Sequence, residues 1–116
     1  MTERERKALD FLREQLGGCR YFQEHPAEGA YRLEHSLRVA RIGAEIARAE
    51  GLGEEHMTIA CLLHDVGYGM DFPKDYDWND HGRDGARIAR PFLAALGLDG
   101  QVVGDICYAI AIHVDD

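Results

Sequence analysis

The sequence has no long apolar run. A helix that spans a membrane needs about 18 or more consecutive apolar residues, and no stretch of this chain provides them. The N-terminus is charged over residues 3–7, and no apolar segment follows that could serve as a secretory signal. We therefore expect a protein without membrane contact that is located in the cytoplasm.

Cysteine and basic charge are both scarce. The three cysteines, Cys19, Cys61 and Cys107, form no Cys-x-x-Cys pair, which argues against a zinc knuckle or a disulfide scaffold. Acidic residues outnumber basic ones by 21 to 13, and the net charge is −8. Because binding to a nucleic-acid duplex needs a basic face, we do not expect a duplex as partner. The protein can still bind a small phosphorylated substrate if bound cations make the local electrostatic potential positive.

Alternating strand patterns are also lacking, and apolar residues recur at helical spacing throughout. At 116 residues the chain can bury a single core. We predict an all-α fold, a compact bundle of about five helices that forms one domain over residues 1–116. The expected helices lie near residues 2–17, 31–50, 54–66, 81–97 and 99–113. Residues 18–29 are expected to form an irregular link, and residues 67–80 a long polar loop.

Two histidines continue apolar stripes. In the 31–50 segment, steps of 4, 3 and 4 residues place one face of a helix along His35, Val39, Ile42 and Ile46. We expect this stripe to be buried and the opposite face, which includes Arg32, to be solvated. In the last segment, steps of 3 or 4 residues connect Val102 or Val103, Ile106, Ile110 and His113.

A histidine and an aspartate follow the apolar run Cys61-Leu62-Leu63. Burying two adjacent polar groups unpaired would cost roughly 2–7 kcal/mol each. His64 and Asp65 are about 100° apart around a helix, so both can reach an ion in a groove between helices.

For any single histidine, a core or surface role without a ligand is the better interpretation. Four histidines outside simple surface roles, together with Asp65, favour a metal site: His35, His64, His81 and His113. A site of histidine and aspartate with open positions suits a catalytic ion better than a structural zinc, which more often uses cysteine.

The ordered motifs resemble a known family. The segments 34–40 (Glu-His-Ser-Leu-Arg-Val-Ala) and 60–67 (Ala-Cys-Leu-Leu-His-Asp-Val-Gly) are similar to the first two motifs of the HD domain superfamily of metal-dependent phosphohydrolases. His81 with Gly85-Ala86, and the segment 109–113, resemble the further histidine motifs of members that hold two metals. The resemblance spans residues 31–113 and implies an HD-type helical fold.

The resemblance also implies a role for each of the five residues. His35, His64 and Asp65 would hold a first divalent ion, and Asp65 would bridge to a second ion held by His81 and His113. One or two ions per chain are implied, of manganese, iron, cobalt, nickel, zinc or magnesium. His64 and Asp65 would be catalytic, because the ions activate water for attack on the phosphorus of a phosphate ester or nucleotide.

Two basic residues are candidates for binding the substrate phosphate. Lys74 lies in the long loop and Arg83 follows His81, so both are expected near the mouth of the site. A solvated surface role is at least as good an interpretation for each.

The sequence departs from the family at its C-terminal end. The family pattern has a further aspartate on a later helix, whereas this chain ends at Asp116, three residues beyond His113. Asp115 and Asp116 follow His113 too closely to take the place of this missing aspartate. We therefore expect the bundle to lack C-terminal helices of the family, and we expect that a homodimer partner could cover the surface left bare.

Two other functions remain open at this stage. Some HD-type proteins with the extra histidines are mixed-valence diiron oxygenases, which the resemblance makes an alternative. The absent final aspartate instead favours a module that binds a nucleotide or a partner without turnover.

Overall fold

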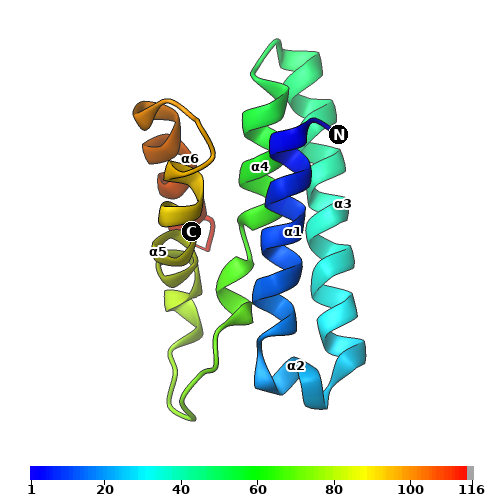
Figure 1. Ribbon diagram of the computed structural model, residues 1–116, viewed down its shortest axis with the longest axis vertical. Helices are drawn as coiled ribbons and strands as arrows, with labels where there is room; N and C mark the ends of the chain where they lie inside the picture. Colours follow the sequence, from blue (N-terminus) through cyan, green and yellow to red (C-terminus); the bar gives the residue numbers. More distant parts are fainter. Residues whose placement is uncertain (115–116) are drawn as a thin grey trace.

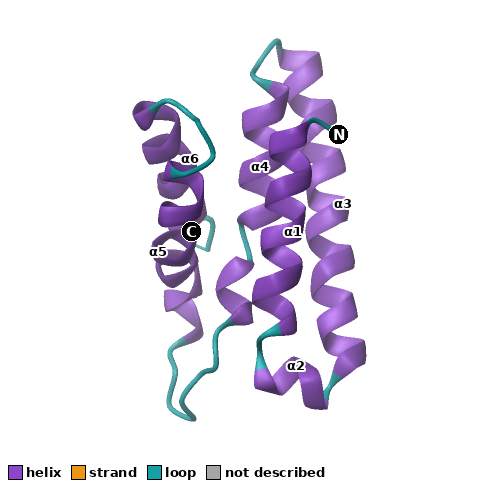
Figure 2. Ribbon diagram, viewed as in Figure 1, coloured by secondary structure: helices purple, strands orange, loops and turns teal. Residues whose placement is uncertain are grey.

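The computed structural model describes residues 1–114, and these form α-helices and short 3-10 helices, with no strand among them (Figure 2). Their bounds in chain order are α1 Glu3–Gly17, α2 Arg20–Glu24, α3 Pro26–Glu50, α4 Glu54–Leu63, η1 Val66–Gly69, η2 Trp78–Asp80, α5 His81–Ala94 and α6 Gly100–Ile112. The prediction of an all-α helical bundle is confirmed.

The helices form two groups (Figure 1). In one group α1, α3 and α4 run side by side, and α2 connects α1 to α3 at one end. In the other, α5 and α6 pair as a hairpin. The short helix η1 packs against both α1 and α5, and α4 contacts α6. One core therefore joins the two groups, with fully buried Leu12, Leu62, Leu93 and Ile110 among its members.

The helix ends follow the local sequence. The hydroxyl of Thr2 accepts from the Glu5 backbone N–H at 3.2 Å and caps α1. Gly51 ends α3 with a φ of 70°, a left-handed conformation that favours glycine. At the start of α6, the Asp99 carboxylate accepts from the Gln101 N–H at 2.8 Å.

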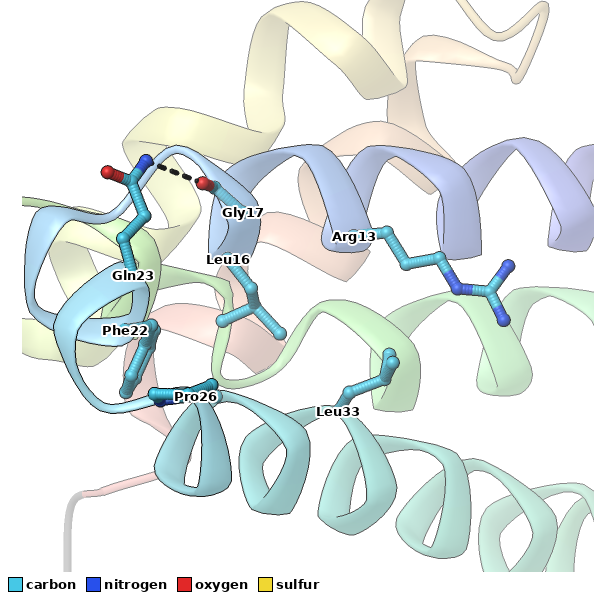
Figure 3. A pocket seen from close by; sticks show the side chains of 8 residues that line it. Arg13, Leu16, Gly17, Phe22, Gln23, Pro26 and Leu33 are labelled. Atoms are coloured by element: carbon cyan, nitrogen blue, oxygen red, sulfur yellow. Dashed lines mark hydrogen bonds between the residues drawn. The ribbon is translucent and has the colours of Figure 1, made fainter.

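The prediction of an irregular link over residues 18–29 is wrong, because α2 forms there and α3 begins at Pro26. Proline suits the first turn of a helix, where its missing N–H costs no hydrogen bond and its fixed φ is already helical. Figure 3 shows the Gln23 side chain donating to the Gly17 carbonyl at 2.9 Å, which fastens α2 to the end of α1. Beside this contact, Phe22 and Leu33 help to line a pocket of about 340 Å³.

The predicted buried stripe of α3 is also wrong. Ile42 and Ile46 are 52% and 51% exposed, whereas the buried positions are Ser36, Ala40, Gly43 and Ala47. Small side chains are needed on this face because α4 lies very close, and a Cβ at Gly43 would stand 2.5 Å from the Cys61 sulfur.

Although α3 has 25 residues, no described helix is both long and apolar enough to cross a membrane.

Pro91 lies inside α5 and does not split it. Proline removes one backbone donor and crowds the carbonyl of the preceding turn. Pro91 is exposed, so the carbonyl that loses its partner lies on the solvent side. The helix therefore continues to Ala94, and Gly97 then turns the chain with a φ of 82°.

Candidate metal centre

The five residues predicted as metal ligands lie together in the structure. They form two groups that could each hold an ion, and the groups share Asp65. The first is His35, His64 and Asp65, and the second is Asp65, His81 and His113. Asp65 lies between the end of α4 and the start of η1 and is only 6% exposed. The shared carboxylate thus lies where the two groups of helices meet.

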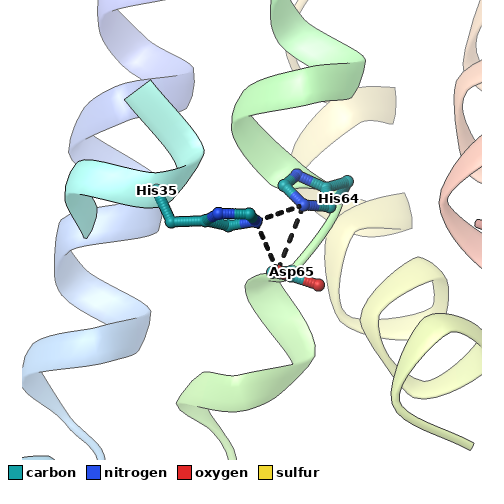
Figure 4. Close-up of side chains that lie close together, drawn as sticks. All are labelled: His35, His64 and Asp65. Atoms are coloured by element: carbon teal, nitrogen blue, oxygen red, sulfur yellow. Dashed lines mark hydrogen bonds and ion pairs between the residues drawn. The ribbon is translucent and has the colours of Figure 1, made fainter. Parts of the chain in front are cut away.

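The first triad joins α3 to the end of α4 (Figure 4). The Nε2 atoms of His35 and His64 lie 3.3 Å and 3.1 Å from Asp65 Oδ2. The same two nitrogens are 3.2 Å apart. Three ligand atoms therefore converge from two helices and the turn that follows α4.

The second triad joins α5 and the end of α6 to the other carboxylate oxygen. The Nε2 atoms of His81 and His113 lie 3.3 Å and 3.0 Å from Asp65 Oδ1. These two nitrogens are also 3.2 Å apart. Each oxygen of Asp65 therefore faces its own pair of histidines.

Three of the histidines are oriented by the backbone of a helix end. Their Nδ1 atoms lie 2.6–2.7 Å from the carbonyl oxygen three residues earlier: His64 on Cys61, His81 on Trp78 and His113 on Ile110. A carbonyl only accepts, so Nδ1 carries the hydrogen and donates it. In a neutral ring Nε2 then carries no hydrogen, and its lone pair points at Asp65. Metal-binding histidines commonly have such a partner on their other nitrogen.

Bare lone pairs this close together repel one another unless a positive species lies between them. A proton on one Nε2 can form a hydrogen bond to only one other atom of the triad. The lone pairs of the remaining atoms then still face each other. A metal ion accepts electron pairs from all three atoms at once. The donor set therefore fits a cation on each side of the Asp65 carboxylate.

The spacing of the ligand atoms also fits an ion. Atoms held about 2.0–2.1 Å from one metal lie about 3.0 Å apart at right angles and about 3.4 Å apart in a tetrahedron. The edges of the first triad measure 3.1–3.3 Å, and those of the second measure 3.0–3.3 Å. Both triads therefore have the dimensions of a metal-ligand set.

The charge states of the ligands suit the same interpretation. Burial raises the pKa of the Asp65 carboxyl, but hydrogen bonds from, and the charge of, His113 and His64 rings protonated on Nε2 lower it by more, so the pKa lies well below its usual range. The carboxylate therefore stays ionised. Burial lowers the pKa of His35 more than the Asp65 charge raises it, so this ring is neutral at pH 7 and can donate a lone pair.

Arg32 is a site residue that the sequence interpretation missed. It was expected on a solvated face, but its Nη1 lies 3.8 Å from Asp65 Oδ2. Its guanidinium carbon also lies 3.8 Å from the centre of the Tyr68 ring. The available signal was its position three residues before His35, which puts both on one side of a helix.

The two basic residues predicted to bind phosphate lie in different places. Lys74 lines a large cleft that also includes Arg32. Arg83 is exposed in the first turn of α5 and is not among the residues that line this cleft. Their roles remain predictions. Asp115 and Asp116, disfavoured above as ligands, lie outside the described residues.

Comparisons with known proteins found partial matches to proteins named Ribonuclease Y. Ribonuclease Y of Mycoplasma mycoides is 42% identical to this chain over 60 residues, which cover 52% of this chain and 14% of the relative. Ribonuclease Y of Mycoplasma capricolum subsp. capricolum is 40% identical over 60 residues, 52% of this chain and 11% of the relative. The chain thus matches only a small part of these longer proteins. No solved structure matches it.

A family model gives the broadest match. The model of the HD domain aligns with residues 32–116, most of the chain. This range contains both triads and Arg32. The chain therefore belongs to the HD domain family, as its histidine motifs indicated.

Proposed function

We propose that this protein is a metal-dependent phosphohydrolase that acts on a phosphate ester or nucleotide. The observation that carries the proposal is the pair of triads that share the buried carboxylate of Asp65. Membership of the HD domain family supports it, as does the partial similarity to proteins named Ribonuclease Y. Two-ion sites of this kind are common in enzymes that cleave phosphate esters.

Each residue of the site has a part in this proposal. The four histidine Nε2 atoms and the two Asp65 oxygens hold the ions, and the backbone carbonyls behind three of the rings fix their orientation. Bound divalent ions supply Lewis acidity toward phosphoryl oxygens and lower the pKa of a water molecule. Arg32 adds a fixed positive charge beside Asp65, where a planar guanidinium can bind a phosphate oxygen.

Hydrolysis of a phosphodiester bond in RNA is the second candidate. The names of the relatives favour it. The acidic net charge of −8 counts against it, because binding to a polynucleotide backbone depends on basic side chains. The same assay separates the two candidates when it includes an RNA substrate.

The test is phosphate release by purified protein loaded with manganese, cobalt or nickel. The substrates are a panel of phosphomonoesters, nucleotides and single-stranded RNA. We expect at least one substrate to be hydrolysed and His64→Ala to lower the rate by about 100-fold or more, because a ligand of the ions is lost. His56→Ala is the matched control, because His56 is an exposed histidine on α4, the helix that ends just before His64, and this variant should retain the activity.

Several results would contradict the proposal. They are no hydrolysis of any substrate by metal-loaded protein, equal activity in His64→Ala, or oxygen consumption by the iron-loaded protein in place of phosphate release. The last result would point to the oxygenase alternative.

A further inference from the structure

We propose that an aromatic cleft beside the metal centre binds the base of a mononucleotide whose phosphate lies at the triads. This inference rests on the proposed function and narrows its substrate class. The cleft has a volume of about 1110 Å³, slightly above the range of roughly 300–1,000 Å³ found for small-molecule sites. We call it the aromatic cleft after the rings that line it, which are Tyr21, Phe22, Tyr31, Tyr68, Phe72 and Trp78.

The rings come from two segments that face each other across the cleft. One wall is α2 with the start of α3, and the other runs from η1 through the following loop to Trp78, the first residue of η2. Tyr21, Tyr31 and Trp78 are each about half exposed, at 49%, 53% and 51%. Ring faces left open to water gain from stacking on a flat heterocycle, and this gain depends little on which base is bound.

Both walls begin at the metal centre. The Tyr31 ring stacks on His35 with centroids 6.1 Å apart, and the Tyr68 ring lies 4.7 Å from His81. Tyr68 in turn stacks on Trp78 at 5.4 Å. A ligand with its phosphate at the triads therefore has its next group between these rings.

Arg32 connects the two parts of the proposed site. Its guanidinium lies over Tyr68 in the wall of the cleft and 3.8 Å from Asp65 in the metal centre. A positive charge at this junction suits the point where the phosphate joins the organic part of the substrate. The cleft thus adjoins the metal centre at Arg32, which lines the cleft and lies beside Asp65.

The charge of the cleft favours a single nucleotide over a polynucleotide. The basic lining residues Arg20, Arg32 and Lys74 are matched in number by the acidic residues Glu24, Glu28 and Asp71. A groove that follows a nucleic-acid backbone carries an excess of positive charge, and this one does not. The positive charge that would attract a phosphate to the triads then comes from the ions and from Arg32, which lies beside Asp65.

The test uses Trp78, the only tryptophan of the chain, as a fluorescent probe of the cleft. The four ribonucleoside 5′-monophosphates, ribose 5-phosphate and a single-stranded oligoadenylate are titrated into manganese-loaded and into EDTA-treated protein. We expect at least one mononucleotide to quench the fluorescence saturably, ribose 5-phosphate to leave it unchanged, and the oligoadenylate to bind no more tightly than AMP. No saturable quenching by any mononucleotide, equal quenching by ribose 5-phosphate, or tighter binding of the oligoadenylate would overturn the inference.

Variants of the cleft provide the second measurement. Tyr21→Leu and Phe72→Leu should each raise the Kd of the mononucleotide about 5- to 100-fold, the loss expected when a stacking ring is removed. Tyr108→Leu is the control, because Tyr108 is an exposed aromatic residue on α6 that does not line the cleft. The Kd of the mononucleotide for this variant should equal its Kd for the unmodified protein. Circular dichroism establishes that each variant is folded. An unchanged Kd in both folded cleft variants would overturn the inference.

The two proposals fail in different ways. Hydrolysis of ribose 5-phosphate by a protein that binds no mononucleotide would overturn the aromatic cleft and leave the phosphohydrolase standing. Saturable quenching by a mononucleotide without hydrolysis of any substrate would support the cleft and contradict the phosphohydrolase.

Discussion

Asp65 is the residue on which both halves of the proposed metal centre depend. Its two oxygens face different pairs of histidines, at distances of 3.0–3.3 Å. Its negative charge is buried, and removing it leaves four imidazole nitrogens close together without an anion between them. One substitution at this residue therefore affects both triads at once.

We predict that the Asp65→Asn variant can no longer bind two ions at the same time. The amide has the size of the carboxylate but lacks its charge, and its NH₂ group is a donor that faces one histidine pair. The manganese content should fall from two ions per chain to one or none, measured by elemental analysis after gel filtration. Asp105→Asn, at an exposed position of α6, should retain two ions. Two ions in Asp65→Asn would contradict this account of the site.

At the residue scale, sequence reasoning identified the candidate ligands from three signals: His35 and His113 continue apolar patterns, the pair His64-Asp65 follows an apolar run, and the ordered motifs resemble the HD domain family. It could not identify Arg32, since an arginine on a helix face is usually solvated and no motif marks it. It also could not show that His64, His81 and His113 each donate to a carbonyl three residues earlier. That contact depends on where each helix ends.

At the scale of elements, η1 sets the distance between Asp65 and the histidines of α5 and α6. It is held tightly on both sides. A Cβ at Gly67 would lie 2.4 Å from the His81 carbonyl oxygen, and one at Gly69 would lie 2.6 Å from the Gln15 carbonyl oxygen. Both obstacles are backbone atoms, which cannot move aside as a flexible side chain can.

Gly67→Ala should therefore separate η1 from α5. We expect it to lower the free energy of unfolding by about 1–3 kcal/mol, the usual cost of overpacking, and to weaken the second triad. Urea denaturation and manganese titration measure the two effects. Gly17→Ala is the matched control, because a Cβ there meets nothing within 4 Å. Equal stability and metal affinity of Gly67→Ala and the unmodified protein would refute the proposed role of η1.

The loop before α5 has its own pH-dependent contact. The Tyr76 hydroxyl donates to Asp84, and this hydrogen bond holds the pKa of that carboxyl below its ordinary value of 3.8. Burial and the contact with Asp84 raise the pKa of Tyr76, so the hydroxyl remains a donor at neutral pH. Because the pKa of Asp84 is lower in the folded state, its contribution is present above pH 3.8 and is lost as the pH falls further.

Tyr76→Phe should lower the free energy of unfolding by about 1 kcal/mol at neutral pH, since one hydrogen bond to a partly buried carboxylate is lost. The difference from the unmodified protein should shrink below about pH 4, where Asp84 becomes protonated in the unfolded chain. Urea denaturation over a pH series gives this difference directly. A difference that is constant down to the acid range would show that the contact does not stabilise the folded state in this way.

That the chain forms helices was easier to predict than which faces of these helices are buried. The all-α class followed from helical spacing. The buried face of α3 was missed because Ile42 and Ile46 are more apolar than the small residues beside them. Close approach of α4 decides which face is buried, and a pattern of hydrophobicity does not contain that distance.

At the scale of the whole molecule, the two groups of helices are joined at two separate places. At the N-terminal end of α1, Arg4 donates to Glu55 on α4 at 3.2 Å and to the carbonyls of Leu96 and Gly97 at 3.3 Å and 3.0 Å. The metal centre lies beyond the C-terminal end of α4 and draws on α3, α5 and α6. Contacts between residues this far apart in sequence leave no local pattern, so the sequence did not predict the arrangement.

Metal binding should therefore stabilise the entire fold. An ion that binds only the folded state at 100 times its Kd raises the free energy of unfolding by about 2.7 kcal/mol, and each proposed ion holds elements distant in sequence together. Thermal unfolding should shift upward with manganese and return to its original value with EDTA. Asp65→Asn should show a smaller shift, or none if it binds no ion. A melting temperature that does not respond to manganese in the unmodified protein would contradict this prediction.

The central claim is that two ions lie on either side of one carboxylate, and anomalous X-ray scattering tests it most directly. Crystals grown with manganese should give two anomalous peaks per chain, one between His35, His64 and Asp65 Oδ2, and one between His81, His113 and Asp65 Oδ1. A single peak, or peaks away from Asp65, would contradict the account.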